Sequence, residues 1–266
     1  MKKILVPCDF SFTSNQALSF ALQLAKRLSA EIIVFTALGS QFTFGSARRA
    51  FEELRKKFGS LDNLTFSTMQ GSVTESIRSQ IDTQNIDLVV MGTNGAAGIK
   101  EYTVGSNTEK VVRFSPVPVI AIRKNVSISS IHNIVIPTDT ETISQGFLWS
   151  LIELQELLNA RLHLLLISTE HRLFNSKDLM KKLKDFVALA GLENYTLNLQ
   201  REDRKEDAIV SFAREVNADM IAMATHGRHG ISHLFMGSLA EDVVNHVSFP
   251  VWTYSIRGAA PVVNFP

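Results

Sequence analysis

The chain has 266 residues, of which 45% are hydrophobic and 20% are charged, and its formal net charge is +1. These values are typical of a globular protein with one large or two modest domains. Without a long Lys/Arg run, they argue against nucleic acid or a membrane as a partner. The first apolar run ends at Pro7, too early for a signal peptide, and Cys8 has no second cysteine to pair with. We therefore expect a cytoplasmic protein.

Short apolar runs alternate with helical patterns along the first half of the chain. Between the first two runs, Ser14–Ala30 carries a wide apolar stripe, and Gly39–Ala47 predicts a mobile loop. This alternation predicts right-handed strand-helix-strand crossovers and an open parallel sheet with helices on both faces. The expected strands are Ile4–Val6, Ile32–Thr36, Leu64–Met69, Leu88–Met91 and Val117–Ile122.

The second half of the chain repeats the first. The segment Lys2–Ser11 is answered by His132–Glu141, and the segment from Asp87 by the segment from Asp219, at offsets of 130 and 132. Matching elements at this spacing indicate duplication of a domain-sized unit. The expected strands of the second unit are Ile134–Ile136, Leu162–Ile167, Tyr195–Leu199, Met220–Met223 and Val251–Tyr254.

The fold class that follows is α/β, with two tandem doubly wound, Rossmann-like domains. Each is expected to hold an open five-stranded parallel sheet, in residues 1–125 and 131–258, with a tail at 259–266. The linker is expected at Arg123–Asn133.

A glycine-rich segment follows the fourth predicted strand. In such sheets, ligands bind beyond the carboxyl ends of the strands, where Asp9 and Gly92 both fall. The spacing Gly92-x2-Gly95-x9-Gly105-Ser106 suits a phosphate, because bare backbone can present its N–H groups to an anion. The alternative is conformational: the glycines are turn residues, and Ser106–Glu109, like Ser238–Glu241, is a capping box. The spacing alone leaves both interpretations open.

Other ligand chemistry has less support in the sequence. Neither G-x-x-x-x-G-K-[ST] nor G-x-G-x-x-G after the first strand occurs, which disfavours P-loop and dinucleotide sites. His226, His229 and His233 could in principle bind zinc, but no cysteine or HExxH motif accompanies them, and we predict no metal site. Beside Asp9, Cys8 is interpreted as a small buried side chain rather than a redox sensor.

Three segments of the first half carry a family resemblance: "ILVPCDFS", "MGTNGAAGIKEYTVGSNTEKVV" and "PVPVIAI". Together with their counterparts in the second half, they resemble the universal stress protein family. The resemblance covers nearly the whole chain and implies a tandem member with domains like those of the adenine-nucleotide α-hydrolases. In ATP-binding members, the glycine pattern holds phosphates and ribose, and the Asp after the first strand lies near adenine. By position, the implied nucleotide-binding residues are Pro7, Cys8, Asp9, Ala37, Met91, Gly92, Asn94, Gly95, Gly105, Ser106, Asn107 and Thr108.

Two other features of the pattern bear on the site. Gly71 resembles the family's glycine after the third strand, although it could equally be a turn leading into a Ser72–Glu75 capping box. In the second unit, Ala224 replaces Gly92, and its methyl group is expected to block a positive φ or a close phosphate contact. We therefore expect a degenerate second site, whose matching residues are Thr138, Asp139, Ile167, Ala224, Gly227, Gly237 and Ser238.

Three functions fit these observations. The first is a stress-response regulatory protein that binds ATP, with or without Mg²⁺, in its first domain and hydrolyses it slowly at most. The second is an interaction protein of the same fold that binds no nucleotide. The third and weakest is an adenylate-forming enzyme, for which no acidic or thiol cluster is evident. The resemblance also implies pairing of the two domains through their last strands, and it is compatible with a homodimer.

Overall fold

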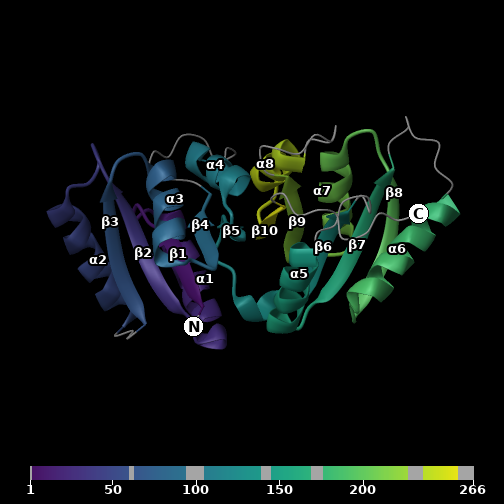
Figure 1. Ribbon diagram of the computed structural model, residues 1–266, viewed down its shortest axis with the longest axis horizontal. Coiled ribbons are helices and arrows are strands. Elements are labelled where there is room, and N and C mark those ends of the chain that lie inside the picture. Colours follow the sequence, from purple (N-terminus) through teal and green to yellow (C-terminus); the bar gives the residue numbers. More distant parts are fainter. Residues whose placement is uncertain are drawn as a thin grey trace. The chain divides into compact units, whose positions relative to one another are not determined.

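The computed structural model describes residues 2–59, 63–93, 105–138, 145–168, 176–226 and 236–256. The chain divides into two compact units between Ile128 and Ser129. Both are of the α/β class, with parallel strands and helices on both faces of the sheet, which confirms the predicted fold class (Figure 1).

The first unit has the sheet order β3-β2-β1-β4-β5, and every strand pair is parallel. The chain moves outward from β1 to β3 and returns to place β4 on the other side of β1. The strand order therefore reverses between β1 and β4, the point where open α/β sheets bind ligands. The elements are β1 (Lys3–Pro7), α1 (Phe12–Leu28), β2 (Glu31–Leu38), α2 (Phe44–Phe58), β3 (Leu64–Gln70), α3 (Val73–Gln84), β4 (Leu88–Gly92), α4 (Ser106–Phe114) and β5 (Val119–Ile122).

The second unit repeats this order as β8-β7-β6-β9-β10, again with parallel strands. The internal repeat in the sequence is therefore a repeat of topology. After a short turn, η1 (Ile128–Ser130), the elements are β6 (Asn133–Thr138), α5 (Gln145–Leu158), β7 (Arg161–Ser168), α6 (Ser176–Ala190), β8 (Tyr195–Arg201), α7 (Lys205–Glu215), β9 (Met220–His226), α8 (Met236–His246) and β10 (Val251–Ile256).

The core of each unit consists of the central strands and the helix faces that cover them. In β1, Ile4, Leu5 and Val6 are almost fully buried. Such strands are covered on both faces, which is why their sequences are continuously apolar. The predicted stripe of α1 is confirmed, since Leu18 and Leu24 are also buried. No helix within the described ranges is long and apolar enough to cross a membrane.

Side-chain caps move several element ends from their predicted positions. The hydroxyl of Ser11 accepts the N–H of Ser14, so α1 begins at Phe12. Thr43 and Ser46 form a capping box that begins α2 at Phe44, and the loop predicted over Gly39–Ala47 is therefore wrong beyond Thr43. The Ser115 hydroxyl bonds to both the N–H and the carbonyl of Val117. Because of this turn, β5 begins at Val119 instead of the predicted Val117.

A carboxylate at the start of the fourth strand ties it to the first strand in both units. Asp87 Oδ2 accepts the N–H of Lys3 at 2.7 Å. Asp219 Oδ2 accepts the N–H groups of His132 and Asn133 at 2.9 and 3.0 Å. The duplication thus extends to a specific side-chain contact at the amino ends of the central strands.

Candidate functional site

The predicted site residues of the first unit lie at the carboxyl ends of the strands, around the reversal between β1 and β4. Pro7 ends β1, Gly92 ends β4, and α4 begins at Ser106. Asn94 and Gly95 lie outside the described residues. The remaining predicted residues belong to β1 and β4, the turn after β1, the end of β2 and the start of α4.

The turn between β1 and α1 is held by its own side chains. Asp9 Oδ1 accepts the N–H of Ser11 at 3.1 Å. The amide of Asn15 donates to the carbonyl of Phe10 at 3.4 Å, and the N–H of Phe10 donates to Cys8 Sγ at 3.4 Å. Phe10 itself has a φ of 60°, in the left-handed region. The turn therefore holds the half-buried side chain of Asp9 in place at the carboxyl ends of the strands.

Cys8 is a core residue whose thiol stays protonated. Its side chain is 5% exposed and donates to Ser14 Oγ at 3.4 Å. Burial raises the pKa of the Cys8 thiol to about 11, and the charge of Asp9 adds to this rise, against the lowering effect of its hydrogen bonds to Ser14 and from the N–H of Phe10. The interpretation of Cys8 as a small buried side chain therefore agrees with the structure.

Gly92 is required by helix packing. A Cβ on Gly92 would lie 2.8 Å from the carbonyl carbon of Thr13, 2.9 Å from its oxygen and 3.0 Å from the nitrogen of Ser14. These are backbone atoms of the first turn of α1, which cannot rotate away. The backbone of Gly92 does not adopt a positive φ, so the expectation that a methyl group here would block such a conformation is wrong.

The start of α4 differs from the capping box that its sequence predicts. Gly105 is the N-cap, with φ −64° and ψ 136°, and it supplies no side-chain hydrogen bond. Ser106 is the first helical residue, so the prediction that it caps the helix is wrong. The N–H groups of Thr108 and Glu109 both donate to the carbonyl of Gly105. The N–H groups of Ser106 and Asn107 form no hydrogen bond to any residue that the structure describes.

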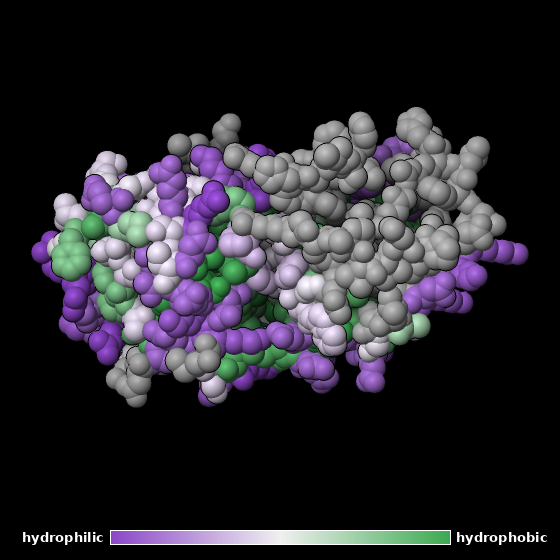
Figure 2. Space-filling model, in the orientation of Figure 1, coloured by the Kyte–Doolittle hydropathy of each residue, from purple (hydrophilic) through white to green (hydrophobic). Residues whose placement is uncertain are grey.

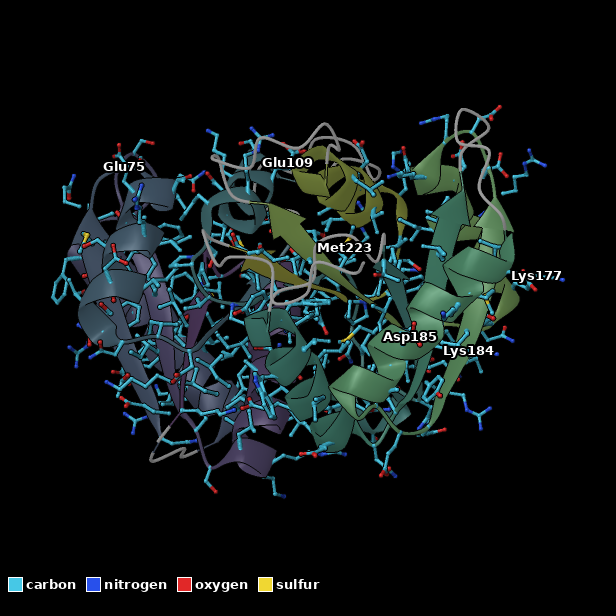
Figure 3. All side chains as sticks on the ribbon, turned by 45° about the vertical axis from the view of Figure 1, so that its right-hand side comes forward. Glu75, Glu109, Lys177, Lys184, Asp185 and Met223 are labelled. Carbon is cyan, nitrogen blue, oxygen red and sulfur yellow. The ribbon has the colours of Figure 1, made fainter. Side chains whose placement is uncertain are left out.

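This uncapped helix start has the chemistry of an anion site. The first N–H groups of a helix have no partner within it, and the helix dipole places partial positive charge there. Ser106 and Asn107 are exposed, and the Asn107 amide oxygen lies 3.5 Å from Thr74 Oγ1 at the start of α3. Glu75 and Glu109, in the first turns of α3 and α4, lie toward the same end of the first unit (Figure 3).

Thr108 and Met91 contribute to the framework of the site. The hydroxyl of Thr108 donates to the carbonyl of Gly92 at 2.9 Å, which fixes α4 against the end of β4. The side chain of Met91 is 4% exposed, so only its backbone could reach a ligand. Ala37, opposite Met69 near the end of β2, is half-buried at the same edge.

The turn after β3 fits the conformational interpretation of its sequence. Gly71 has a φ of +134°, which favours glycine. Ser72 caps α3 by accepting the N–H of Glu75, while its hydroxyl donates to the Glu75 carboxylate at 2.8 Å. The N-cap half of the predicted capping box is therefore present, whereas the Glu75 carboxylate bonds to the Ser72 hydroxyl instead of the Ser72 backbone N–H.

The second unit presents less of its predicted site in the described residues. Asp139 and Gly227 lie outside them, as do His229 and His233. Thr138 ends β6, Ile167 lies opposite Gln200, and Ala224 is buried opposite Tyr254. Gly237 and Ser238 lie inside α8, which includes Met236, so the prediction that Ser238 caps this helix is wrong. No group of His, Cys, Asp or Glu in the described part of the chain could hold a metal ion.

Two aromatic residues that sequence reasoning did not single out pack together next to the predicted site residue Asp9. The rings of Phe10 and Phe42 pack edge to face, with centroids 5.5 Å apart and planes at 68°. Phe10 follows Asp9, and Phe42 lies in the loop after β2. The sequence signal that could have found them is position, because Phe10 follows β1 and Phe42 follows β2, at the end of the sheet where ligands bind.

Comparison with known proteins agrees with this architecture. The universal stress protein family profile matches residues 1–53, 41–123 and 130–255. The chain belongs to the universal stress protein family. A universal stress protein of Synechocystis sp. is 23% identical over 96% of this chain and 100% of its own length. Another, from Methanocaldococcus jannaschii, is 27% identical over 46% of this chain and 82% of its own.

Solved structures show the same fold over both units. The crystal structure of a universal stress protein from Archaeoglobus fulgidus covers 95% of this chain and 98% of its own, with a TM-score of 0.69 and 19% identity. A protein of unknown function from Pseudomonas aeruginosa covers 96% and 92%, with a TM-score of 0.71 and 17% identity. The tandem arrangement of this universal stress protein is thus shared by other known proteins.

Proposed function

We propose that the first unit of this universal stress protein binds ATP, with or without Mg²⁺, and that nucleotide occupancy regulates its shape or its choice of partner. The observation that carries the proposal is the start of α4. There, the N–H groups of Ser106 and Asn107 lack acceptors among the described residues and stand at the positive end of the helix dipole. Phosphate is the ligand that such a helix start favours.

The rest of the proposed site surrounds this anion position. Asp9 and Ala37, at the ends of β1 and β2, are the residues that the family resemblance assigns to the adenine side. Asn94 and Gly95 complete the phosphate pattern by the same resemblance. Thr108 acts by positioning, because its hydroxyl is already donated to the carbonyl of Gly92. We expect hydrolysis to be slow, since the proposal assigns no base or arginine to the γ-phosphate.

The substitution Ser106→Asp tests this proposal. An acidic residue in the first turn of α4 suits the helix dipole and should leave the fold as stable or slightly more stable, by about 0.3 to 1 kcal/mol. The same charge would repel a phosphate, and like charges at about 4 Å repel by roughly 1 to 4 kcal/mol. We expect ATP affinity measured by calorimetry to fall about tenfold or more.

Ser106→Asn is the matched control, because it has the size of aspartate without its charge. Equal ATP affinity of the Asp and Asn variants would contradict a phosphate at α4. The proposal fails altogether if acid extraction of the purified protein releases no nucleotide and millimolar ATP leaves its melting temperature unchanged.

The alternative is an interaction protein of the same fold without a nucleotide. It is favoured by one observation: Gly92 is explained by its contact with α1 and needs no phosphate. The acid extraction and the ATP melting experiment distinguish the two functions, because only the first predicts bound nucleotide.

The second unit is proposed to be degenerate. Ala224 stands in place of Gly92, and Asp203 stands in place of Gly71, whose φ of +134° favours glycine. The domain limits 1–125 and 131–258, the cytoplasmic location, the pairing of the two domains and a homodimer also stay predictions. Limited proteolysis, fractionation and sedimentation test them.

A further inference from the structure

The aromatic pair of Phe10 and Phe42 lies at the same edge of the first unit as the proposed nucleotide site. Phe10 follows β1 and Phe42 follows β2. Both rings are half-buried, so each keeps part of its surface open to solvent. In an edge-to-face pair, the ring that offers its edge keeps both of its faces out of this contact, while its partner uses one face. A flat aromatic ligand can therefore add to this pair.

Both rings are held in place by the backbone that carries them. Phe10 has a φ of 60°, a conformation that bulky residues rarely adopt and that clusters at ligand sites. The hydrogen bonds from its N–H to Cys8 Sγ and from Asn15 to its carbonyl maintain this conformation. On the other side, the N–H of Gly39 donates to the carbonyl of Phe42 at 3.1 Å, and Thr43 caps α2 directly after it.

Two further phenylalanines close to the pair in sequence are largely exposed. Phe12 and Phe44, the first residues of α1 and α2, are 72% and 58% exposed. Apolar side chains reach the surface among polar ones on the α2 side of the first unit (Figure 2).

The second unit has no aromatic residue at the position that corresponds to Phe10, in the turn after β1. At the offset of 130, Cys8, Asp9 and Phe10 correspond to Thr138, Asp139 and Thr140. The carboxylate is kept, whereas the aromatic ring is not. This difference accompanies the replacement of Gly92 by Ala224, so the unit with the complete glycine pattern is also the one with the aromatic pair.

We propose that Phe10 and Phe42 form an aromatic wall against the base of the bound nucleotide and make the site prefer purine over pyrimidine bases. This inference rests on the proposed function. Asp9 is adjacent to Phe10, and Ala37 lies five residues before Phe42, so the wall borders the residues expected at the base. A purine offers two fused rings to the wall and a pyrimidine only one, so the purine buries more apolar surface.

The test compares ATP, CTP and inorganic triphosphate as ligands of the full-length protein. Phe10→Gly removes one ring while easing the left-handed backbone, so this variant should keep its fold. Phe42→Ala removes the other ring. Each substitution should lower the affinity for ATP about tenfold, leave the affinity for triphosphate unchanged and reduce the preference for ATP over CTP. Phe12→Ala, outside the pair and largely exposed, is the control and should change none of these affinities.

The outcomes separate the two proposals. If the wild-type protein binds neither ATP nor triphosphate, the proposed function fails and the wall fails with it. If the wild-type protein binds ATP, and Phe10→Gly and Phe42→Ala bind it equally well with native circular dichroism spectra, only the wall is overturned. An equal loss of ATP and triphosphate affinity in these variants would also overturn it, because a base contact leaves triphosphate binding unchanged.

Discussion

At the scale of single residues, Gly92 provides the sharpest test of the structure. Gly92→Ala would press a methyl group against backbone atoms of Thr13 and Ser14 at 2.8 to 3.0 Å. Relief requires α1 to move away from the end of β4, and overpacking of this kind costs about 1 to 3 kcal/mol. We expect urea unfolding to show a loss of stability of this size.

Gly45→Ala is the matched control for that substitution. Gly45 lies in the first turn of α2, and a Cβ there would have nothing within 4 Å. Alanine is the better helix former, so this variant should be neutral or more stable by up to about 1 kcal/mol. Equal destabilisation by the two substitutions would contradict the close approach of α1 to Gly92.

The sequence indicated that a glycine matters at position 92, but it could not show that the reason is packing against α1. Its spacing from Gly95 and Gly105 is compatible with a phosphate site, whereas the contact with Thr13 joins segments far apart in the chain. The Phe10 and Phe42 pair was missed for the same reason, since neither residue alone predicts its partner. Cys8 was easier, because an apolar run and an adjacent charge already favoured a buried thiol.

At the scale of secondary-structure elements, a polar network joins three strands of the second unit. His163 in β7 has its Nε2 3.1 Å from Asn133 Oδ1 in β6 and its Nδ1 2.8 Å from Thr196 Oγ1 in β8. Because the Asn133 oxygen can only accept, Nε2 carries the proton and Nδ1 accepts from the threonine. The ring also packs edge to face against Phe212 of α7. The neutral imidazole thus forms one hydrogen bond to a side chain of each neighbouring strand.

This network predicts a pH dependence of stability. Burial lowers the pKa of His163 from its usual 6.5, and the charge of Arg161 adds to the effect. As the pH falls below 6.5, the unfolded chain takes up a proton that the folded histidine resists, so this residue destabilises the fold progressively in acid. Urea unfolding between pH 5 and pH 7.5 should therefore show a steeper loss for wild type than for a variant without His163.

His163→Ile is that variant, because Ile33 occupies the matching position in β2 of the first unit. At neutral pH, it should lose about 1 to 3 kcal/mol through the unpaired Asn133 and Thr196 side chains. The other histidines are common to both proteins and cancel in the comparison. Parallel pH profiles of wild type and variant would show that His163 does not titrate differently in the folded chain.

Elements were predictable where a periodic pattern is long, and their ends were not. The stripe of α1 and the buried strands follow from apolar periodicity, which the core of each unit enforces. The starts of helices depend on a few competing caps. For α4, Gly105 rather than Ser106 is the N-cap, and this shift by one residue exposes the N–H groups on which the proposed site depends.

At the scale of the whole molecule, duplication preserved the frame and changed the sites. Both units keep the strand order and the carboxylate at the start of the fourth strand, Asp87 and Asp219. They differ in sequence at two positions, because Ala224 and Thr140 stand where the first unit has Gly92 and Phe10. The sequence predicted the exchange of Gly92 for Ala224, because the repeat supplies its own internal comparison, whereas the packing of Phe10 was found only in the structure. We propose that only the first unit binds nucleotide.

We therefore expect one ATP to bind per chain in calorimetric titration of the full-length protein. Ser106→Asp, in α4, should lower this affinity, whereas Ser238→Asp, at the matching position of α8, should change neither affinity nor stoichiometry. Both substitutions add one negative charge near the start of a helix, so their general electrostatic effects are alike. A stoichiometry of two per chain, with one site lost in each variant, would show that both units bind nucleotide and that Ala224 and Thr140 are compatible with a working site.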